Sequence, residues 1–263
     1  MNDRLLLYDR ELLLLGRKRN AVLELWEVER YGKDSYGNPE YVSIYGMRPA
    51  DWYANGARLL GRTAVECTRD ELGDAIGKDV AAIVTTRPVT APTLIVDAFS
   101  GSGNTLYWIL RHIAGARCIG FESDTGVFSV TRQNIEALAL PIEIVNADYR
   151  SGLSSVIVAP GELLVTFIAP PWGNALARTS GLDLRRTSPP VTDIVDVLLH
   201  RFPHNQLLCV IQVYQIVLPD SMSELKARFD WSTERIYDLN TSGQNHGIVL
   251  ATKGWRPPTW PPT

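Results

Sequence analysis

Three acidic residues follow three apolar runs of the chain, at the points where predicted strands end. Asp97 ends the run LIVD, Glu122 ends CIGFE, and Asp148 follows EIVNA. Because the carboxyl ends of parallel strands meet at one edge of a sheet, we expect these carboxylates to line one crevice. Asp97 suits a ligand that carries positive charge, such as an amino or sulfonium group. Glu122, about 25 residues later, can hold the two hydroxyls of a ribose, and Asp148 or the adjacent backbone can meet an adenine amine.

A glycine-rich turn, FSGSGNT, follows the first of these acids. Gly101 and Gly103 let the backbone turn tightly against a ligand, and a helix that begins at Asn104 and Thr105 offers unpaired N–H groups. The dinucleotide fingerprint G-x-G-x-x-G requires a third glycine where this chain has Leu106, so a pyrophosphate cradle fits less well. Glycines alone also suit a turn without a ligand. With the three acids, however, the pattern predicts a site for an adenosine-containing cation, S-adenosylmethionine (SAM).

The stretch FIAPPWGN ends a fourth apolar run in a rigid turn. Because Pro170 and Pro171 have no N–H, the carbonyls of Ala169 and Pro170 can remain as acceptors that face the site. They can accept hydrogen bonds from a planar, uncharged amine and keep its lone pair directed at a methyl group, so that no strong base is required. Trp172 offers a flat face on which a planar or cationic substrate can stack. The alternative is a turn whose tryptophan packs against the core.

The elements that must position these residues follow from hydrophobic periodicity. Beyond about residue 90, β-rich apolar runs alternate with helix-like stretches, which predicts βαβ units and a mostly parallel sheet. Two late strands are close enough in sequence to pair antiparallel at a sheet edge. We expect strands at residues 93–99, 117–122, 142–147, 163–168, 206–214, 233–237 and 247–252, and helices at 105–114, 125–139, 192–202 and 221–228.

The first 90 residues mix helical and strand spacing. We expect a strand and loop element there, followed by a helical segment over residues 52–78. The domain organisation is therefore an N-terminal extension at 1–85 that is a candidate substrate lid, a sheet domain at 86–255, and a proline-rich tail at 256–263.

The composition limits the class of protein. The chain has 263 residues, 45% of them hydrophobic, and a formal net charge of −3, which does not favour tight nonspecific binding to a nucleic-acid backbone. Cys67, Cys118 and Cys209 lie far apart without metal-ligand spacing, as expected of reduced thiols in the cytoplasm. The sequence contains no apolar run long enough to span a bilayer, and its first 15 residues do not resemble a signal peptide. The four histidines show no metal spacing either.

The segments VDAFSGSGNT, GFESD, NADY and APPWGN resemble the successive motifs of the trimethylguanosine synthase family, the RNA cap guanine-N2 methyltransferases. The segment WYANGARLLGRTAVECTRDEL is similar to the stretch before the family's catalytic domain, with Thr68 in place of its threonine-proline turn. The resemblance covers residues 50–175. It implies an α/β, Rossmann-like class I methyltransferase with a mostly parallel seven-stranded sheet and an antiparallel final strand. It also implies SAM as cofactor and an exocyclic amine as methyl acceptor.

By this resemblance, Asp97, Gly101 and Gly103 meet the methionine end of SAM, Glu122 the ribose and Asp148 the adenine. Trp172 stacks on the substrate base. The full set of candidates on the cofactor side is Thr68, Asp97, Phe99, Gly101, Gly103, Asn104, Thr105, Glu122, Ser123 and Asp148. The candidates on the catalytic and substrate side are Ala169, Pro170, Pro171, Trp172, Asn174 and Tyr214.

The chain departs from the family at two positions of the proline-tryptophan motif. Ala169 stands where the family has serine, and Asn174 stands where it has a second glycine. Basic residues after the motif are either an anion contact or a solvated loop; they are Arg178, Arg185 and Arg186. Gln244 and His246 either border the substrate pocket or lie in a loop.

Several readings of the function stay open. The leading one is a SAM-dependent N-methyltransferase whose partner is a small-molecule or nucleotide-like substrate, with an RNA cap among the candidates. A natural-product, protein or DNA nitrogen could use the same turn, although the acidic balance disfavours duplex DNA and structured RNA. A catalytically silent SAM-binding module has no need of the proline-tryptophan turn, and a nicotinamide dehydrogenase is disfavoured by Leu106.

Overall fold

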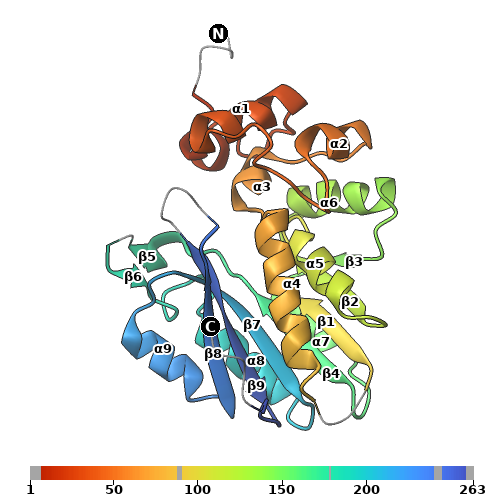
Figure 1. Cartoon of the computed structure of the whole chain (residues 1–263), viewed down its shortest axis with the longest axis vertical. Coiled ribbons are helices and arrows are strands. Elements are labelled where there is room, and N and C mark those ends of the chain that lie inside the picture. The colour runs from red at the N-terminus through yellow and green to blue at the C-terminus, as the bar shows by residue number, and fades with distance from the viewer. Residues whose placement is uncertain (1–6, 88–90, 178, 240–244, 259–263) are drawn as a thin grey trace.

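The computed structural model describes residues 7–87, 91–177, 179–239 and 245–258. Its central feature is a seven-stranded sheet with the strand order β3-β2-β1-β4-β7-β9-β8 (Figure 1). Five strands of this sheet run parallel: β3, β2, β1, β4 and β7. In contrast, β9 is antiparallel to both of its neighbours, β7 and β8. Their bounds are β1 Thr93–Asp97, β2 Arg117–Glu122, β3 Glu143–Asn146, β4 Leu163–Ile168, β7 Leu207–Tyr214, β8 Trp231–Tyr237 and β9 His246–Lys253. The predicted sheet, with its antiparallel final strand, is confirmed.

Helices cover both faces of this sheet and explain why its central strands are so apolar. Every residue of β1 and β4 is buried, as expected of parallel strands without a solvent face. The side chain of Ile95 points to one face of the sheet, and those of Leu94 and Val96 to the other. The covering helices are α4 Asp70–Val84, α5 Asn104–His112, α6 Thr125–Ala137, α7 Tyr149–Ser155, α8 Val191–Arg201 and α9 Pro219–Lys226.

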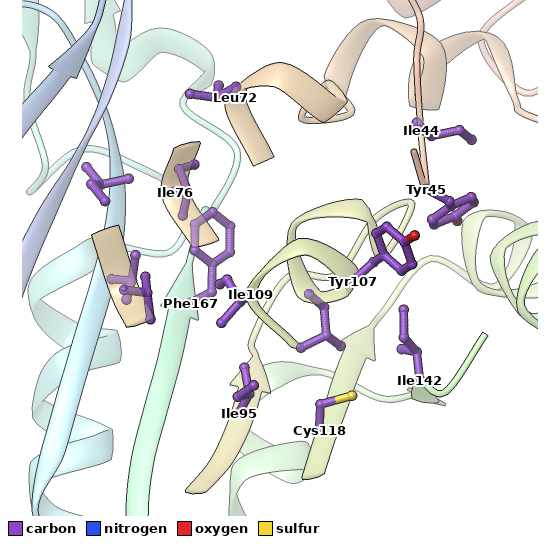
Figure 2. Packing of buried hydrophobic residues seen from close by; sticks show 14 of the residues in the cluster. Ile44, Tyr45, Leu72, Ile76, Ile95, Tyr107, Ile109, Cys118, Ile142 and Phe167 are labelled. Atoms are coloured by element: carbon purple, nitrogen blue, oxygen red, sulfur yellow. The ribbon is translucent and has the colours of Figure 1, made fainter. Parts of the chain in front are cut away.

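The larger core cluster joins the sheet to α4, α5 and the N-terminal extension. Figure 2 shows Ile95 and Phe167 on the strands, Ile76 on α4 and Ile109 on α5 directed toward one another. On the side of the extension, the ring of Tyr45 meets that of Tyr107 edge to face, with 5.8 Å between the ring centres (Figure 2). The extension is therefore packed into the same core as the sheet.

The N-terminal extension is helical, so the expected strand and loop element is wrong. It contains a short π-helix at Glu11–Leu15, α1 Leu25–Tyr36, α2 Pro49–Ala54 and α3 Gly61–Glu66 (Figure 1). α1 begins with a capping box, in which the side chains of Glu24 and Glu27 each accept a backbone N–H bond, and it ends at Gly37 with φ +71°. The helical segment expected over residues 52–78 consists of three helices, α2, α3 and part of α4, and α4 continues to Val84.

One helix and two short strands of the sheet domain were absent from the sequence prediction. They are α7 and a small antiparallel pair, β5 Leu176–Ala177 with β6 Gly181–Leu182, that follows the proline-tryptophan turn. In the part of the chain that the structure describes, no helix combines the length and the apolar character needed to cross a membrane.

Candidate functional site

Asp97 is the last residue of β1, and its side chain is almost completely buried. Its Oδ1 accepts a hydrogen bond from the N–H of Phe99 at 3.0 Å. Burial raises the pKa of Asp97 to about 7, and the nearby charge of Glu122 adds to the effect. A cation bound here would restore the ionised carboxylate. The buried acid is therefore suited to a positively charged ligand.

The turn after β1 depends on two glycines in the left-handed region, Gly101 with φ +50° and Gly103 with φ +73°. The hydroxyl of Thr131 donates to the carbonyl of Gly101 at 2.7 Å and fixes the turn against α6. A Cβ at Gly101 would meet no atom within 4 Å, so the outer side of the turn is open to a ligand. Gly103 is the N-cap of α5.

Glu122, at the end of β2, is joined directly to this turn. One of its carboxylate oxygens accepts the N–H of Gly101 at 3.0 Å, and the other accepts the N–H of Asp124 at 2.8 Å. Burial raises the pKa of Glu122 above its ordinary value. Each oxygen keeps a second lone pair with which to accept a ribose hydroxyl. The neighbouring Ser123 is exposed.

Asp148 lies beyond the end of β3 as the N-cap of α7, where its Oδ1 accepts the N–H of Arg150 at 2.9 Å. It is exposed, and its other carboxylate oxygen accepts no hydrogen bond among the described residues. The half-buried ring of Phe99 lies 5.4 Å from the ring of Tyr149, which places an aromatic surface between the turn after β1 and α7.

Asn104 and Thr68 link the extension to the glycine turn. The Asn104 amide donates to the carbonyl of Thr68 at 2.7 Å and to Asp70 at 3.1 Å, and its oxygen accepts the N–H of Tyr45 at 2.7 Å. The Asn104 N–H also donates to the Ser102 hydroxyl at 3.4 Å, so the predicted contact of these two residues with SAM would have to use other atoms. Thr105 is buried in the first turn of α5.

The proline-tryptophan turn extends β4 on the other side of β1, since Asp97 pairs with Phe167 in the sheet. The carbonyl of Pro171 accepts the N–H of Ser188 at 3.2 Å. Within the described residues, no donor contacts the carbonyls of Ala169 and Pro170. These two carbonyls are therefore unpaired among the described residues; Ala169 is half-buried and Pro170 is buried.

Trp172 is half-buried. Its ring centre lies 6.4 Å from that of Tyr214, at the end of β7, and 5.2 Å from that of His246, at the start of β9. Asn174 is exposed in a short 3₁₀ turn after Gly173, which has φ +47°. The rings of Trp172 and Tyr214, two of the candidate substrate residues, thus lie close together, and the ring of His246 lies beside them.

Two groups modify the electrostatics around Trp172. Burial, and secondarily the charge of Arg69, lower the pKa of His246 to about 4, so the ring is neutral at physiological pH. The guanidinium of Arg69 lies over the ring of Tyr41, 4.1 Å from its centre. The extension therefore contributes a positive charge to this side of the sheet.

The basic loop is only partly suited to an anion. Arg185 is paired with Asp183 through contacts of 2.9 and 3.0 Å, which favours the solvated-loop reading for this residue. Arg178 and Gln244 lie outside the described residues. The described part of the chain holds no group of three histidine, cysteine or acidic side chains that could bind a metal ion.

No protein-family model and no curated protein matches this chain. Similar solved structures include an rRNA methylase from Streptococcus thermophilus, with 15% identity over 71% of this chain and 98% of that chain and a TM-score of 0.43. They also include the N-terminal domain of human METTL16 in complex with SAH, with 13% identity over 68% of each chain and a TM-score of 0.45. A third is the precorrin-6y C5,15-methyltransferase from Geobacter metallireducens, with 12% identity over 72% of this chain and 90% of that chain and a TM-score of 0.43.

At these identities and scores, the fold assignment depends on this chain's own strand order rather than on the likeness. Five parallel strands, followed by an antiparallel strand inserted between β7 and β8, form the Rossmann-like sheet of class I methyltransferases. The chain therefore has the class I methyltransferase fold.

Proposed function

We propose that this protein is a SAM-dependent N-methyltransferase that acts on a planar amine, with a guanine-type base as the acceptor class. One observation carries the proposal. The buried acid and glycine turn that suit a cationic adenosine ligand lie at the end of β1, and the rigid turn with free carbonyls and Trp172 lies at the end of the adjacent β4. A methyl donor and a planar acceptor bound at these two places would be neighbours.

The residues at the ends of β1, β2 and β3 form the cofactor half of the site, and they fit SAM in charge and shape. Asp97 and the turn at Gly101 and Gly103 would hold the amino acid end, because a buried carboxylate is matched by the ammonium and sulfonium charges. Glu122 would accept the ribose hydroxyls, and Asp148 would meet the adenine amine. Bound there, SAM supplies an electrophilic methyl group.

The turn at Ala169–Trp172 forms the acceptor half of the site, and it needs only to orient the nucleophilic nitrogen. An amine conjugated to a ring is uncharged at neutral pH, and its N–H groups can donate to the carbonyls of Ala169 and Pro170. These hydrogen bonds direct the nitrogen lone pair toward the methyl group, and positioning supplies most of the rate gain. Trp172 would fix the plane of the acceptor by stacking, which contributes about 1–3 kcal/mol for a base.

Calorimetry with SAM, S-adenosylhomocysteine and NAD tests the cofactor half. We expect binding of the first two and none of NAD. Binding of NAD alone would remove the methyltransferase proposal. Asp97→Ala should weaken SAM binding at least tenfold, because it removes a charge-assisted contact.

A methyl-transfer screen with labelled SAM then tests the acceptor class. It should cover cap analogues, nucleosides, peptides and metabolite extracts, since the resemblance to cap guanine-N2 methyltransferases and a natural-product acceptor predict different labelled products. A protein that binds SAM but labels none of them would instead be a silent binding module. We further propose that the N-terminal extension serves as a substrate lid, because the charge of its Arg69 acts on the pKa of His246, whose ring lies 5.2 Å from that of Trp172.

A further inference from the structure

Two buried hydroxyl groups from other parts of the fold bind the glycine turn after β1. The hydroxyl of Thr131, on α6, donates to the carbonyl of Gly101 at 2.7 Å. The hydroxyl of Tyr45, in the N-terminal extension, donates to the carbonyl of the next residue, Ser102. Thr131 is 1% exposed and Tyr45 3% exposed. Two consecutive peptide groups of the turn are therefore held from outside, one by α6 and one by the extension.

The contact of Thr131 with the turn is specific to this side chain. A threonine inside a helix commonly donates its hydroxyl to a carbonyl of its own helix, three or four residues earlier. Thr131 lies within α6, but its hydroxyl donates across to the turn. Its methyl carbon lies 3.7 Å from the position that a Cβ at Gly103 would occupy. Both ends of the side chain thus face the turn.

The turn needs such external bonds because two glycines flank Ser102 in the sequence. Glycine populates positive and negative φ about equally, so the peptide groups between Gly101 and Gly103 have alternative orientations of similar energy. The hydrogen bond from Thr131 selects the one in which the Gly101 carbonyl points to α6. Since this peptide bond is trans, the N–H of Ser102 is directed away from α6.

The N–H of Ser102 is the donor that this orientation leaves unused. The neighbouring N–H groups have partners, since that of Gly101 donates to Glu122 and that of Asn104 donates to the Ser102 hydroxyl. Among the described residues, the N–H of Ser102 has no acceptor. The amino acid end of SAM carries a carboxylate as well as an ammonium group, and a backbone N–H is a strong donor to a carboxylate.

We propose that Thr131 and Tyr45 are positioning residues for the cofactor, which hold the turn in the orientation that offers the N–H of Ser102 to the carboxylate of SAM. Each acts through the backbone of the turn. This inference rests on the proposed function and adds two residues outside the candidate site. It also makes the extension, through Tyr45, a component of the cofactor half.

Calorimetry with S-adenosylhomocysteine on the full chain tests the two hydroxyls. Thr131→Val keeps the shape of the side chain and removes the hydroxyl, so the affinity should fall about tenfold, because the turn then samples orientations that do not bind. Thr131→Ser retains the hydroxyl and should recover most of the affinity. Tyr45→Phe should weaken binding about as much as Thr131→Val.

A second ligand and a matched variant separate positioning from a general loss of structure. 5′-Methylthioadenosine lacks the amino acid end, so Thr131→Val should bind it as tightly as the wild type does. Thr252, on β9, is as buried as Thr131, and its hydroxyl donates to the carbonyl of Trp255 at 2.8 Å. β4 and β7 separate this strand from β1. Thr252→Val loses a comparable hydrogen bond and should leave the affinity for S-adenosylhomocysteine unchanged.

Unchanged affinity for S-adenosylhomocysteine in Thr131→Val would overturn the proposal. Equal losses for both ligands in this variant, or an equal loss in Thr252→Val, would also overturn it, because a purely structural role has that effect. If Tyr45→Phe does not fold, as judged by urea denaturation, the comparison of valine and serine at Thr131 decides. These outcomes refute only this inference, whereas failure of the wild type to bind S-adenosylhomocysteine refutes the proposed function itself.

Discussion

Lowering the pH from about 8 to about 6 should weaken SAM binding roughly tenfold through the titration of Asp97. This carboxyl is almost fully buried, and burial, with the charge of Glu122 as a second cause, raises its pKa to about 7. A bound cation requires the ionised form. Below the pKa, binding must first release a proton, which costs about 1.4 kcal/mol, or a factor of ten, for each pH unit.

The same shift has a consequence for stability. Because the folded-state pKa of Asp97 lies above the unfolded value, the folded state holds this proton more tightly, and the stability that it provides is present below about pH 4 and lost as the pH rises through about 7. The loss amounts to about 4 kcal/mol if the whole shift is realised. Asp97→Asn removes the carboxyl and therefore this loss of stability, so the variant should have a higher free energy of unfolding than the wild type above neutral pH.

Calorimetry at the two pH values measures the binding effect, and urea denaturation measures the stability effect. Asp97→Asn is also the control for titration of the amino group of SAM itself, since the variant retains that titration but lacks the carboxyl. It should bind SAM at least tenfold more weakly, because the charge-assisted contact is lost. If wild type and variant showed the same pH dependence of SAM affinity, the assignment of this acid to the cation would be refuted.

Three further substitutions test other parts of the site and its frame. Trp172→Ala should abolish methyl transfer and leave the calorimetric SAM affinity unchanged; an unfolded variant would instead support the core-packing reading. Asn104→Ala should lower the free energy of unfolding by about 2–4 kcal/mol in urea, since it leaves buried groups of the extension unpaired, and an unchanged midpoint would contradict this. Gly152→Ala would place a Cβ 2.5 Å from the Phe121 ring and should lower the free energy of unfolding by about 1–3 kcal/mol. The control Ser154→Ala, at an exposed position, should change it little. Equal urea midpoints for the two variants would argue against the close packing.

The sheet and the positions of its acids were accessible from the sequence because they depend on local patterns. Strands with both faces covered are continuous apolar runs, and β2 and β4 have the bounds that this pattern predicts. Asp97 and Glu122 come together because parallel strands align their carboxyl ends, a rule that requires no knowledge of distant contacts.

The N-terminal extension could not be predicted in the same way. Its leucine-rich opening has no clear period, and the short helix at Glu11–Leu15 is fixed by packing against α3 rather than by local propensity. α7 was missed because YRSGLSS contains a glycine and three serines, which are weak helix formers, and the N-cap at Asp148 supplies what the sequence lacks.

The place of His246 beside Trp172 depends on contacts that are distant in sequence. The two residues are 74 positions apart, and the antiparallel register of β7 with β9 brings them together. The sequence placed His246 just before the last strand, which favoured a loop position over a place at the border of the pocket. Only the register decides between them.

A crystal structure of the protein with S-adenosylhomocysteine tests the central claim most directly. The account predicts the amino acid end of the ligand against Asp97 and the glycine turn, the ribose on Glu122, and the sulfur directed toward the turn at Ala169–Trp172. A crevice left empty at saturating ligand, or a ligand bound away from the ends of β1 and β2, would contradict it.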